Sequence, residues 1–299
     1  ASDVYKRQIK EELYIMKTSI KAFAIICAGI LTAGVLTACG TEKNVSSQTA
    51  STIKVGASPS PHTEILNAVK DQLAKEGVNL EIVEFNDYVQ PNLALSDGSL
   101  DANFFQHEPY LKEFCETRGL QLVSLGGVHI EPMSAYSDKV KSIQELQDGA
   151  TIAVPNDPTN EGRALLLLQS AGLIKLRDAA SLTATPQDII ENPHHFKFTE
   201  LEAPQLPRTL QDTDLAIINM NFALDAKLDP NKAILTEGTD SPYANIIAVR
   251  SGDENRPELQ KLIKALTSEE AKTFIEQKYK GSIIPASVSY THLTLPTIA

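Results

Sequence analysis

An aromatic and polar stretch, DANFFQHEPYL at residues 101–111, has the residue types of a small-molecule pocket. Phe105 and His107 are two residues apart, so both side chains point to the same side of a strand. Tyr110 follows at the start of the next predicted helix. Open α/β sheets bind ligands at the carboxyl ends of their strands, which is where these residues fall. The stretch predicts either a pocket or an aromatic core in which a neighbour satisfies His107.

Arg163 stands in the first turn of a predicted helix, behind the turn-forming residues of VPNDPTNEGRALLLLQ (154–169). The apolar helix face that follows does not need a long cation for packing. A guanidinium beside the positive end of a helix is a natural carboxylate site, because its paired N–H groups and the exposed backbone N–H groups act together. The alternative is a salt bridge on the surface.

Two asparagines follow a predicted strand in IINMNFAL (217–224). Asn219 and Asn221 each offer donors and an acceptor, which suits an ammonium and a carboxylate held together. One of them is also expected to cap the next helix.

Short β-rich runs alternate with amphipathic helices from Ile53 onward, which predicts an α/β fold with largely parallel sheets. A second α/β unit begins near Ser142. We therefore expect two lobes, with residues 53–137 and 238–287 in the first and 138–237 in the second. The expected strands are 53–58, 79–85, 102–106, 120–128, 132–137, 150–155, 196–201, 215–220, 234–238 and 245–250. The expected helices are 60–77, with Ser60 as N-cap and Pro61 in its first position, 91–100, 109–118, 142–147, 160–171, 207–211, 221–227, 257–266 and 269–279.

Composition excludes several classes of protein. The chain has 299 residues and a formal net charge of −11, without the clustered basic residues that a nucleic-acid surface needs. Of the three cysteines only Cys115 falls in the globular part, so no disulfide framework is expected there. Cys115 is predicted to be a buried apolar side chain of its helix.

The N-terminal region predicts a membrane attachment. Residues 16–38, from Met16, combine a cationic start with an apolar run that is short of the about 20 residues of a spanning helix, as in a signal peptide. Leu36-Thr37-Ala38-Cys39 resembles the bacterial lipobox, which makes Cys39 the predicted lipidated N-terminus, with residues 39–52 as its flexible tether. Residues 1–15 and 288–299 are expected to be non-native.

Common enzyme signatures are absent: the sequence contains no GxSxG, HExxH, Walker A or GxGxxG pattern. An enzyme with His107 as general acid or base remains an alternative, with Glu108 as its only adjacent acidic partner. A metal-binding protein that uses His62, His107 and His129 is another. The pair His194-His195 is expected in a solvated loop.

Several long motifs in order resemble the NlpA-type lipoproteins, the methionine-binding components of ABC importers. The resemblance covers Met16 to Ser287. It rests on the lipobox, NDYVQPN (86–92), DANFFQHEPYL, VPNDPTNEGRALLLLQ, FTELEAPQLPRTL (198–210), INMNFA (218–223) and SPYANIIAVR (241–250).

The resemblance implies a two-lobed periplasmic-binding-protein fold (type 2-like) with a ligand cleft between the lobes. Arg163 would bind the α-carboxylate, and Asn221 and Asn245 would order the carboxylate and amino groups, with Asn160 as a lesser candidate. The residues implied for the side-chain pocket are Tyr88, Phe105, His107 and Tyr110.

The same resemblance implies a monomeric binder rather than an enzyme. No cofactor and no metal are expected. Its expected partners are methionine, an ABC permease with its ATPase, and the membrane through Cys39; nucleic acid is not among them. The protein would lie on the extracytoplasmic face of a cell membrane. L-methionine, D-methionine, Met-containing dipeptides and other small amino acids remain open as ligands.

Overall fold

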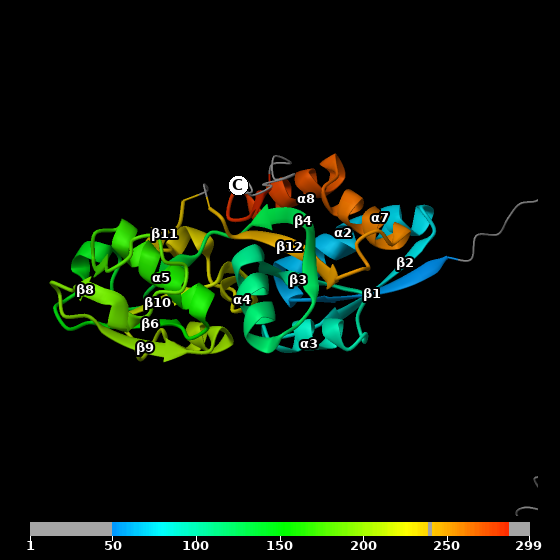
Figure 1. The fold of residues 1–299 in the computed structure, drawn as a ribbon. Helices are drawn as coiled ribbons and strands as arrows, with labels where there is room; N and C mark the ends of the chain where they lie inside the picture. The colour runs from blue at the N-terminus through cyan, green and yellow to red at the C-terminus, as the bar shows by residue number, and fades with distance from the viewer. Residues whose placement is uncertain (1–49, 239–240, 287–299) are drawn as a thin grey trace, which may run out of the picture. The chain divides into compact units, whose positions relative to one another are not determined.

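The computed structural model describes residues 50–238 and 241–286, and a six-stranded sheet and a five-stranded sheet dominate it (Figure 1). The six-stranded sheet has the order β13-β4-β12-β3-β1-β2. Strand β1 runs parallel to β2 and β3, whereas β12 is antiparallel to β3 and β4. Its strands are β1 (Ser51–Ala57), β2 (Val78–Glu84), β3 (Ala102–His107), β4 (Leu122–Ile130), β12 (Ala244–Arg250) and β13 (Ile284–Pro285).

The five-stranded sheet has the order β11-β5-β10-β6-β9. Strand β6 is parallel to β9 and β10, and β5 is antiparallel to β10 and β11. Its strands are β5 (Ser134–Tyr136), β6 (Thr151–Pro155), β9 (Lys197–Leu201), β10 (Leu215–Ile218) and β11 (Leu235–Thr236). A separate pair joins β7 (Lys175–Leu176) to β8 (Ile189–Glu191).

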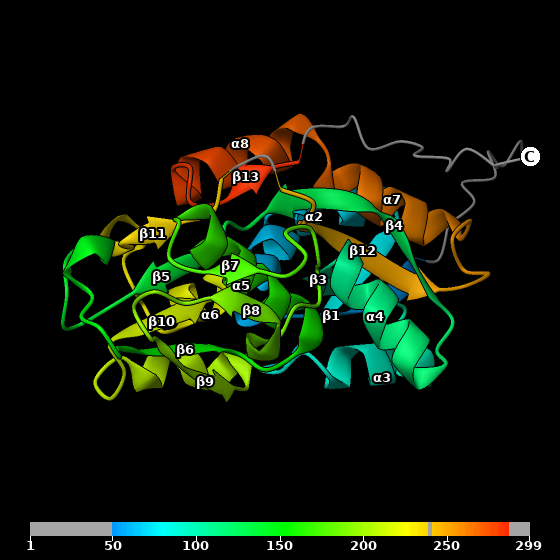
Figure 2. The same ribbon diagram turned by 60° about the vertical axis from the view of Figure 1, so that its left-hand side comes forward.

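Helices cover both faces of each sheet (Figure 2). Alternate residues of β12 belong to two different core clusters: Ile247 packs with α2, α7 and α8, whereas Ile246 packs with α3 and α4. In the second sheet, Ile217 of β10 packs with α5, and Ile218 packs in the cluster that contains α6. The helices are α2 (Glu64–Lys75), α3 (Gln90–Ser96), α4 (Glu108–Arg118), α5 (Pro158–Ser170), α6 (Met220–Asp225), α7 (Pro257–Leu266) and α8 (Glu269–Tyr279).

Three predicted helices differ from the structure. Ser60 has extended φ and ψ of −127° and 140°, so the predicted helix does not begin there. Ser60 interrupts a short π-helical turn (Pro59–Thr63), and α2 begins after it at Glu64. Residues 142–147 form only a 3-10 turn (Ile143–Glu145), because Leu146 is extended. Residues 207–211 fall in and after a 3-10 helix (Ala203–Thr209), where Pro207 lacks the N–H of an α-helical hydrogen bond.

The chain crosses between the sheets twice, from β4 to β5 and from β11 to β12. The first crossing occurs before Ser134, because β5 already belongs to the second sheet. The lobe boundary expected after residue 137 is therefore a few residues later in the sequence than the crossing. The remaining boundaries stay a prediction. The predicted signal peptide, Cys39, most of the predicted tether and residues 288–299 lie outside the described residues.

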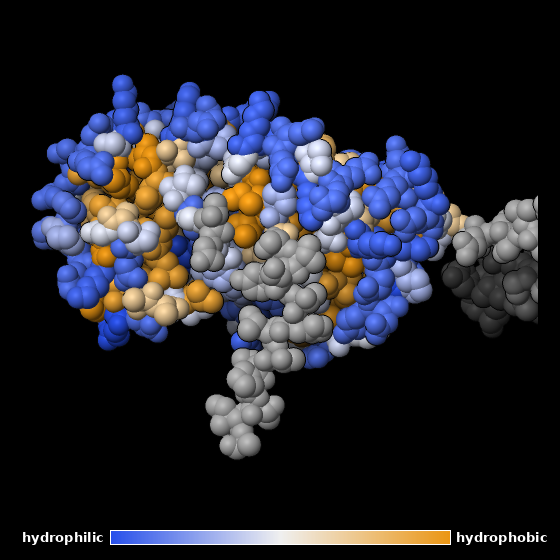
Figure 3. All heavy atoms as spheres, turned by 90° about the horizontal axis from the view of Figure 1, so that it is seen from above, coloured by the Kyte–Doolittle hydropathy of each residue, from blue (hydrophilic) through white to orange (hydrophobic). Residues whose placement is uncertain are grey.

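Seen from above, the described residues present mostly hydrophilic side chains along the outline of the molecule (Figure 3). Apolar side chains form smaller areas between these hydrophilic ones. Ile190 in β8 and Leu182 in the segment between β7 and β8 are exposed apolar residues. Cys115 is half-buried rather than buried, and burial raises the pKa of its thiol. No helix within residues 50–238 and 241–286 is long and apolar enough to span a membrane.

Replacing Gly162 of α5 with alanine should destabilise the protein by about 1–3 kcal/mol. A Cβ atom there would lie 2.5 Å from the carbonyl oxygen of Leu182, so the backbone segment after β7 would have to move. Urea unfolding of Gly162→Ala and Gly238→Ala tests this, since a Cβ at Gly238 meets no atom of the described residues within 4 Å. Equal stability of the two variants would contradict the packing described for α5.

Candidate ligand-binding site

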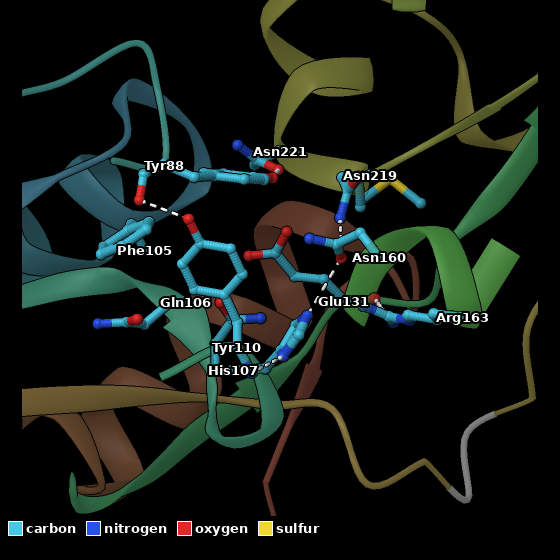
Figure 4. A pocket seen from close by; sticks show the side chains of 12 residues that line it. Tyr88, Phe105, Gln106, His107, Tyr110, Glu131, Asn160, Arg163, Asn219 and Asn221 are labelled. Carbon is cyan, nitrogen blue, oxygen red and sulfur yellow. Dashed lines mark hydrogen bonds between the residues drawn. The ribbon is translucent and has the colours of Figure 1, made fainter. Parts of the chain in front are cut away.

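A pocket with about 330 Å³ of empty space, its open mouth included, lies between elements of the two sheets (Figure 4). The structure brings together around it every ligand-binding residue predicted from the sequence: Tyr88, Phe105, His107, Tyr110, Arg163, Asn221 and Asn245. Asn160 and Asn219, the lesser candidates from the sequence, also line the pocket, together with Gln106, Glu131 and Met220, which the sequence did not indicate.

Strand geometry and register explain part of this convergence. Phe105 and His107 alternate with Phe104 on β3, so they line the pocket while Phe104 enters the core. Asn245 of β12 lies opposite His107 of β3 and, on its other side, opposite His129 of β4. Residues more than 100 positions apart in sequence are therefore cross-strand neighbours.

Aromatic rings form one wall of the pocket. The Tyr88 ring centroid lies 5.8 Å from those of Phe105 and Tyr110, and 4.9 Å from that of Phe222. The hydroxyl of Tyr110 donates to the backbone oxygen of Tyr88 at 2.8 Å, and the hydroxyl of Tyr88 donates to Oδ1 of Asn221 at 2.6 Å. The wall is thus fixed by its own hydrogen bonds, including one that reaches α6.

Arg163 is buried, with 2% of its surface exposed, so the alternative of a surface salt bridge is wrong. Its Nε donates to Glu237 at 3.1 Å, and its Nη2 donates to Glu237 at 2.5 Å and to the backbone oxygen of Glu131 at 2.7 Å. The guanidinium also lies 4.2 Å from the ring centroid of Tyr243. Nη1 makes no hydrogen bond to the described residues and remains available to a ligand.

The position of Arg163 on α5 also differs from the prediction. The helix begins at Pro158, so Arg163 lies in its second turn rather than its first. Asp157 caps the helix by accepting from the backbone N–H of Asn160 at 3.0 Å. Part of the positive helix end is therefore already satisfied by the protein, and the guanidinium is the main cationic group of the pocket.

The asparagines leave unpaired polar atoms in the pocket. Nδ2 of Asn219 donates to Oδ1 of Asn160 at 2.8 Å, but Oδ1 of Asn219 and Nδ2 of Asn221 are buried without a partner among the described residues. Buried polar atoms are usually paired, so an unmatched acceptor and an unmatched donor suggest the place of a ligand. Asn219 is the N-cap of α6, but its side chain makes no capping hydrogen bond.

His107 is a buried imidazole with both nitrogens in contact with protein atoms. Nδ1 accepts from the backbone N–H of Tyr110 at 3.2 Å, and Nε2 lies 3.1 Å from Oδ1 of Asn160, to which it donates as the protonated nitrogen. Burial, and then the Arg163 charge, lower the pKa of His107 to about 3. The imidazole is neutral, and Glu108 is exposed, so the arrangement offers little support for a general acid or base.

His62 and His129 meet at Glu131 rather than at His107. Nε2 of His129 lies 2.7 Å and Nε2 of His62 lies 3.2 Å from Oε1 of Glu131, and all three residues are buried. These atoms could hold a metal ion. Metal-bound histidines usually donate their other N–H to a partner, whereas Nδ1 of both rings has none here. The exposed pair His194-His195 lies in a solvated loop, as predicted.

Stability should fall as the pH falls below about 6.5. Burial lowers the pKa of His62 to about 4 and the pKa values of His107 and His129 to about 3, so below 6.5 the unfolded chain binds protons that the folded protein excludes. The raised pKa of Glu131 opposes this in part. We expect a loss of about 2 kcal/mol or more between pH 7 and pH 5 in urea unfolding. His194→Gln should keep this slope, and a flat profile to pH 5 would contradict the burial of neutral histidines.

Comparison with known proteins adds to this geometry. The profile of the family described as NlpA lipoprotein matches residues 53–287. The chain belongs to the NlpA lipoprotein family. One related protein is the D-methionine-binding lipoprotein MetQ of Salmonella typhi. The two sequences are 43% identical over 274 residues, which cover 90% of this chain and 99% of the relative.

Solved structures agree with the NlpA assignment. A nutrient-binding protein from Burkholderia cenocepacia, solved bound to methionine, is 50% identical with a TM-score of 0.76, over 79% of this chain and 100% of that one. An ABC-transporter periplasmic substrate-binding protein from Coxiella burnetii is 47% identical with a TM-score of 0.75, over 78% and 100%. The predicted family and the two-lobed binding-protein fold are confirmed.

Proposed function

We propose that this NlpA-family protein captures methionine outside the cytoplasm and delivers it to an ABC importer. The observation that carries the proposal is a pocket with a buried guanidinium and unpaired asparagine atoms at one end and a wall of aromatic rings at the other. The first end suits the charged groups of an amino acid, and the second suits its side chain. The relatives, a D-methionine-binding lipoprotein and a nutrient-binding protein solved with methionine, indicate methionine as the specific ligand.

Each predicted residue then has a chemical role. Arg163 binds the α-carboxylate through Nη1, with Nδ2 of Asn221 as a second donor, and Asn245 helps to order the amino group. A thioether against the rings of Tyr88, Phe105 and Tyr110 gains about 0.3–1.5 kcal/mol per contact. His107 closes the side-chain pocket from β3.

Ligand binding is coupled to closure of the two lobes. Arg163 and Asn221 lie on α5 and α6, which follow strands β6 and β10 of the second sheet, whereas Phe105 and Asn245 lie on strands of the first. A ligand that contacts both favours the closed arrangement, which is the form that docks on a permease. The protein acts as a monomeric binder without catalysis, and lipidated Cys39 holds it on the extracytoplasmic face of the membrane.

Calorimetric titration of ligand-free protein with L-methionine, D-methionine and Gly-Met tests the proposal. We expect saturable heat with at least one form of methionine. Heat with Gly-Met alone, or with another small amino acid alone, would move the assignment to those ligands. No heat with any of the three would refute methionine capture.

A further inference from the structure

Glu131 is a buried acidic side chain that lines the pocket and was not among the predicted site residues. It directly follows β4, and Figure 4 shows its carboxylate pointing in among the pocket side chains. Behind it lie the rings of His62 and His129, whose Nε2 atoms are 3.2 and 2.7 Å from Oε1. The carboxylate is thus held from the rear and accessible from the pocket.

The histidines act on Glu131 as neutral hydrogen-bond donors. Nδ1 of both rings is buried without a partner among the described residues. An N–H left unpaired inside a protein is rarer than an unpaired acceptor, so the proton of each ring belongs on Nε2. Nε2 of His129 directs it at Oε1 of Glu131 at 2.7 Å. Nε2 of His62 lies 3.1 Å from Oδ1 of Asn245 and 3.2 Å from Oε1 of Glu131, so its N–H is shared between these two oxygens. Burial lowers the pKa of both rings far below neutrality. The contact of His129 with Glu131 is therefore a hydrogen bond and not an ion pair, and the neutral His62 ring divides its N–H between Asn245 and Glu131.

The charges around Glu131 do not balance. The guanidinium of Arg163 is paired with the carboxylate of Glu237 and reaches Glu131 only through its backbone oxygen, at 2.7 Å. Among the described residues no other cation contacts Glu131; the backbone N–H of Asn221 contributes a dipole. A buried carboxylate without a counter-charge is costly, and burial raises the pKa of Glu131 accordingly.

We propose that Glu131 is the counter-ion of the α-ammonium group of the bound amino acid, and that His62 and His129 are positioning residues that fix the carboxylate. The proposal rests on amino-acid capture by this pocket. Arg163 donates a hydrogen bond to the backbone oxygen of Glu131, so the guanidinium lies next to the residue that carries the carboxylate. That spacing suits a ligand with its carboxylate and ammonium on one carbon.

A metal ion on His62, His129 and Glu131 is the competing use of the same atoms. It would occupy the carboxylate and remove its preference for an ammonium group. The unpaired Nδ1 atoms favour the hydrogen-bonded arrangement, as argued above. The two uses differ in metal content and in ligand preference, and both can be measured on tag-free protein.

The test compares L-methionine with 4-(methylthio)butanoate, which lacks only the amino group. Wild-type protein should bind methionine at least 100-fold more tightly, and Glu131→Gln should reduce this ratio below tenfold. A wild-type ratio below tenfold would overturn the proposal without any variant. If wild-type protein bound neither compound, methionine capture itself would be refuted. If Glu131→Gln had the same ratio of affinities as wild type, only the role of Glu131 would be refuted.

The positioning role has its own matched pair of variants. His129→Leu should reduce the preference for methionine over the deaminated compound, whereas His129→Gln, whose amide N–H can still donate to Glu131, should restore most of it. Loss of binding of both ligands in equal proportion would indicate a merely structural role. Stoichiometric zinc or manganese in wild-type protein, absent from His129→Leu, would overturn the proposal in favour of a metal site.

Discussion

Arg163→Ala should weaken methionine binding by about 2–4 kcal/mol, or roughly 30- to 1,000-fold. Arg163 is buried at the pocket, and its Nη1 is the donor left over after the contacts with Glu237 and Glu131. Without it, the ligand carboxylate would lose its cationic partner in the pocket. Calorimetry on the variant, with L-methionine, measures the loss.

The pairing of Arg163 with Glu237 requires a control, because the alanine variant also leaves Glu237 without its partner. Arg163→Lys keeps the charge but not the planar, forked donor geometry, so we expect an intermediate loss of affinity. Urea unfolding of each variant separates loss of binding from loss of folding. A loss below tenfold in a folded Arg163→Ala variant would mean that the guanidinium serves the Glu237 contact and not the ligand.

Phe104→Ala should lower the free energy of unfolding by about 3–5 kcal/mol. Phe104 is fully buried in the core cluster of β3, and its ring lies edge-on to His62 at 4.6 Å and to His129 at 5.3 Å. The substitution would leave a cavity beside the histidines that hold Glu131. Chemical denaturation measures the effect.

The neighbouring residue provides the matched comparison. Phe105 points into the pocket from the opposite side of β3, so Phe105→Ala should weaken ligand binding more than it affects stability. The exposed Val83, replaced with alanine, should change stability by less than about 0.5 kcal/mol. The assignment of the two faces of β3 would be wrong if Phe104→Ala lowered the free energy of unfolding by less than about 1 kcal/mol. It would also be wrong if Phe105→Ala lowered the free energy of unfolding more than Phe104→Ala does.

The sequence predicts the order of strands and helices well, because hydrophobic periodicity and turn residues act locally. It predicts helices less well where a proline or an extended residue interrupts the pattern, as Pro207 and Ser60 do. The sequence places Arg163 in the first turn because the expected helix begins at residue 160, whereas α5 begins at Pro158 and is capped by Asp157. These are errors of a few residues, and they do not change which side chains reach the pocket.

Pairings between distant segments were not accessible from local patterns. Glu131 follows a strand in VHIEP, which is the kind of position that favours a site, but its importance depends on His62, which lies far away in sequence. The contact of Arg163 with Glu237 depends likewise on the second sheet and on the return crossing after β11. Motif resemblance identified the pocket residues, whereas the charge balance around them required the structure.

The most direct test of methionine capture is a crystal structure of the protein grown with L-selenomethionine as the added ligand and ordinary methionine in the chain. We expect one anomalous selenium peak among the rings of Tyr88, Phe105 and Tyr110, with the ligand carboxylate at Arg163. A ligand bound in the reverse orientation, or a pocket without a selenium peak at saturating ligand, would contradict this expectation.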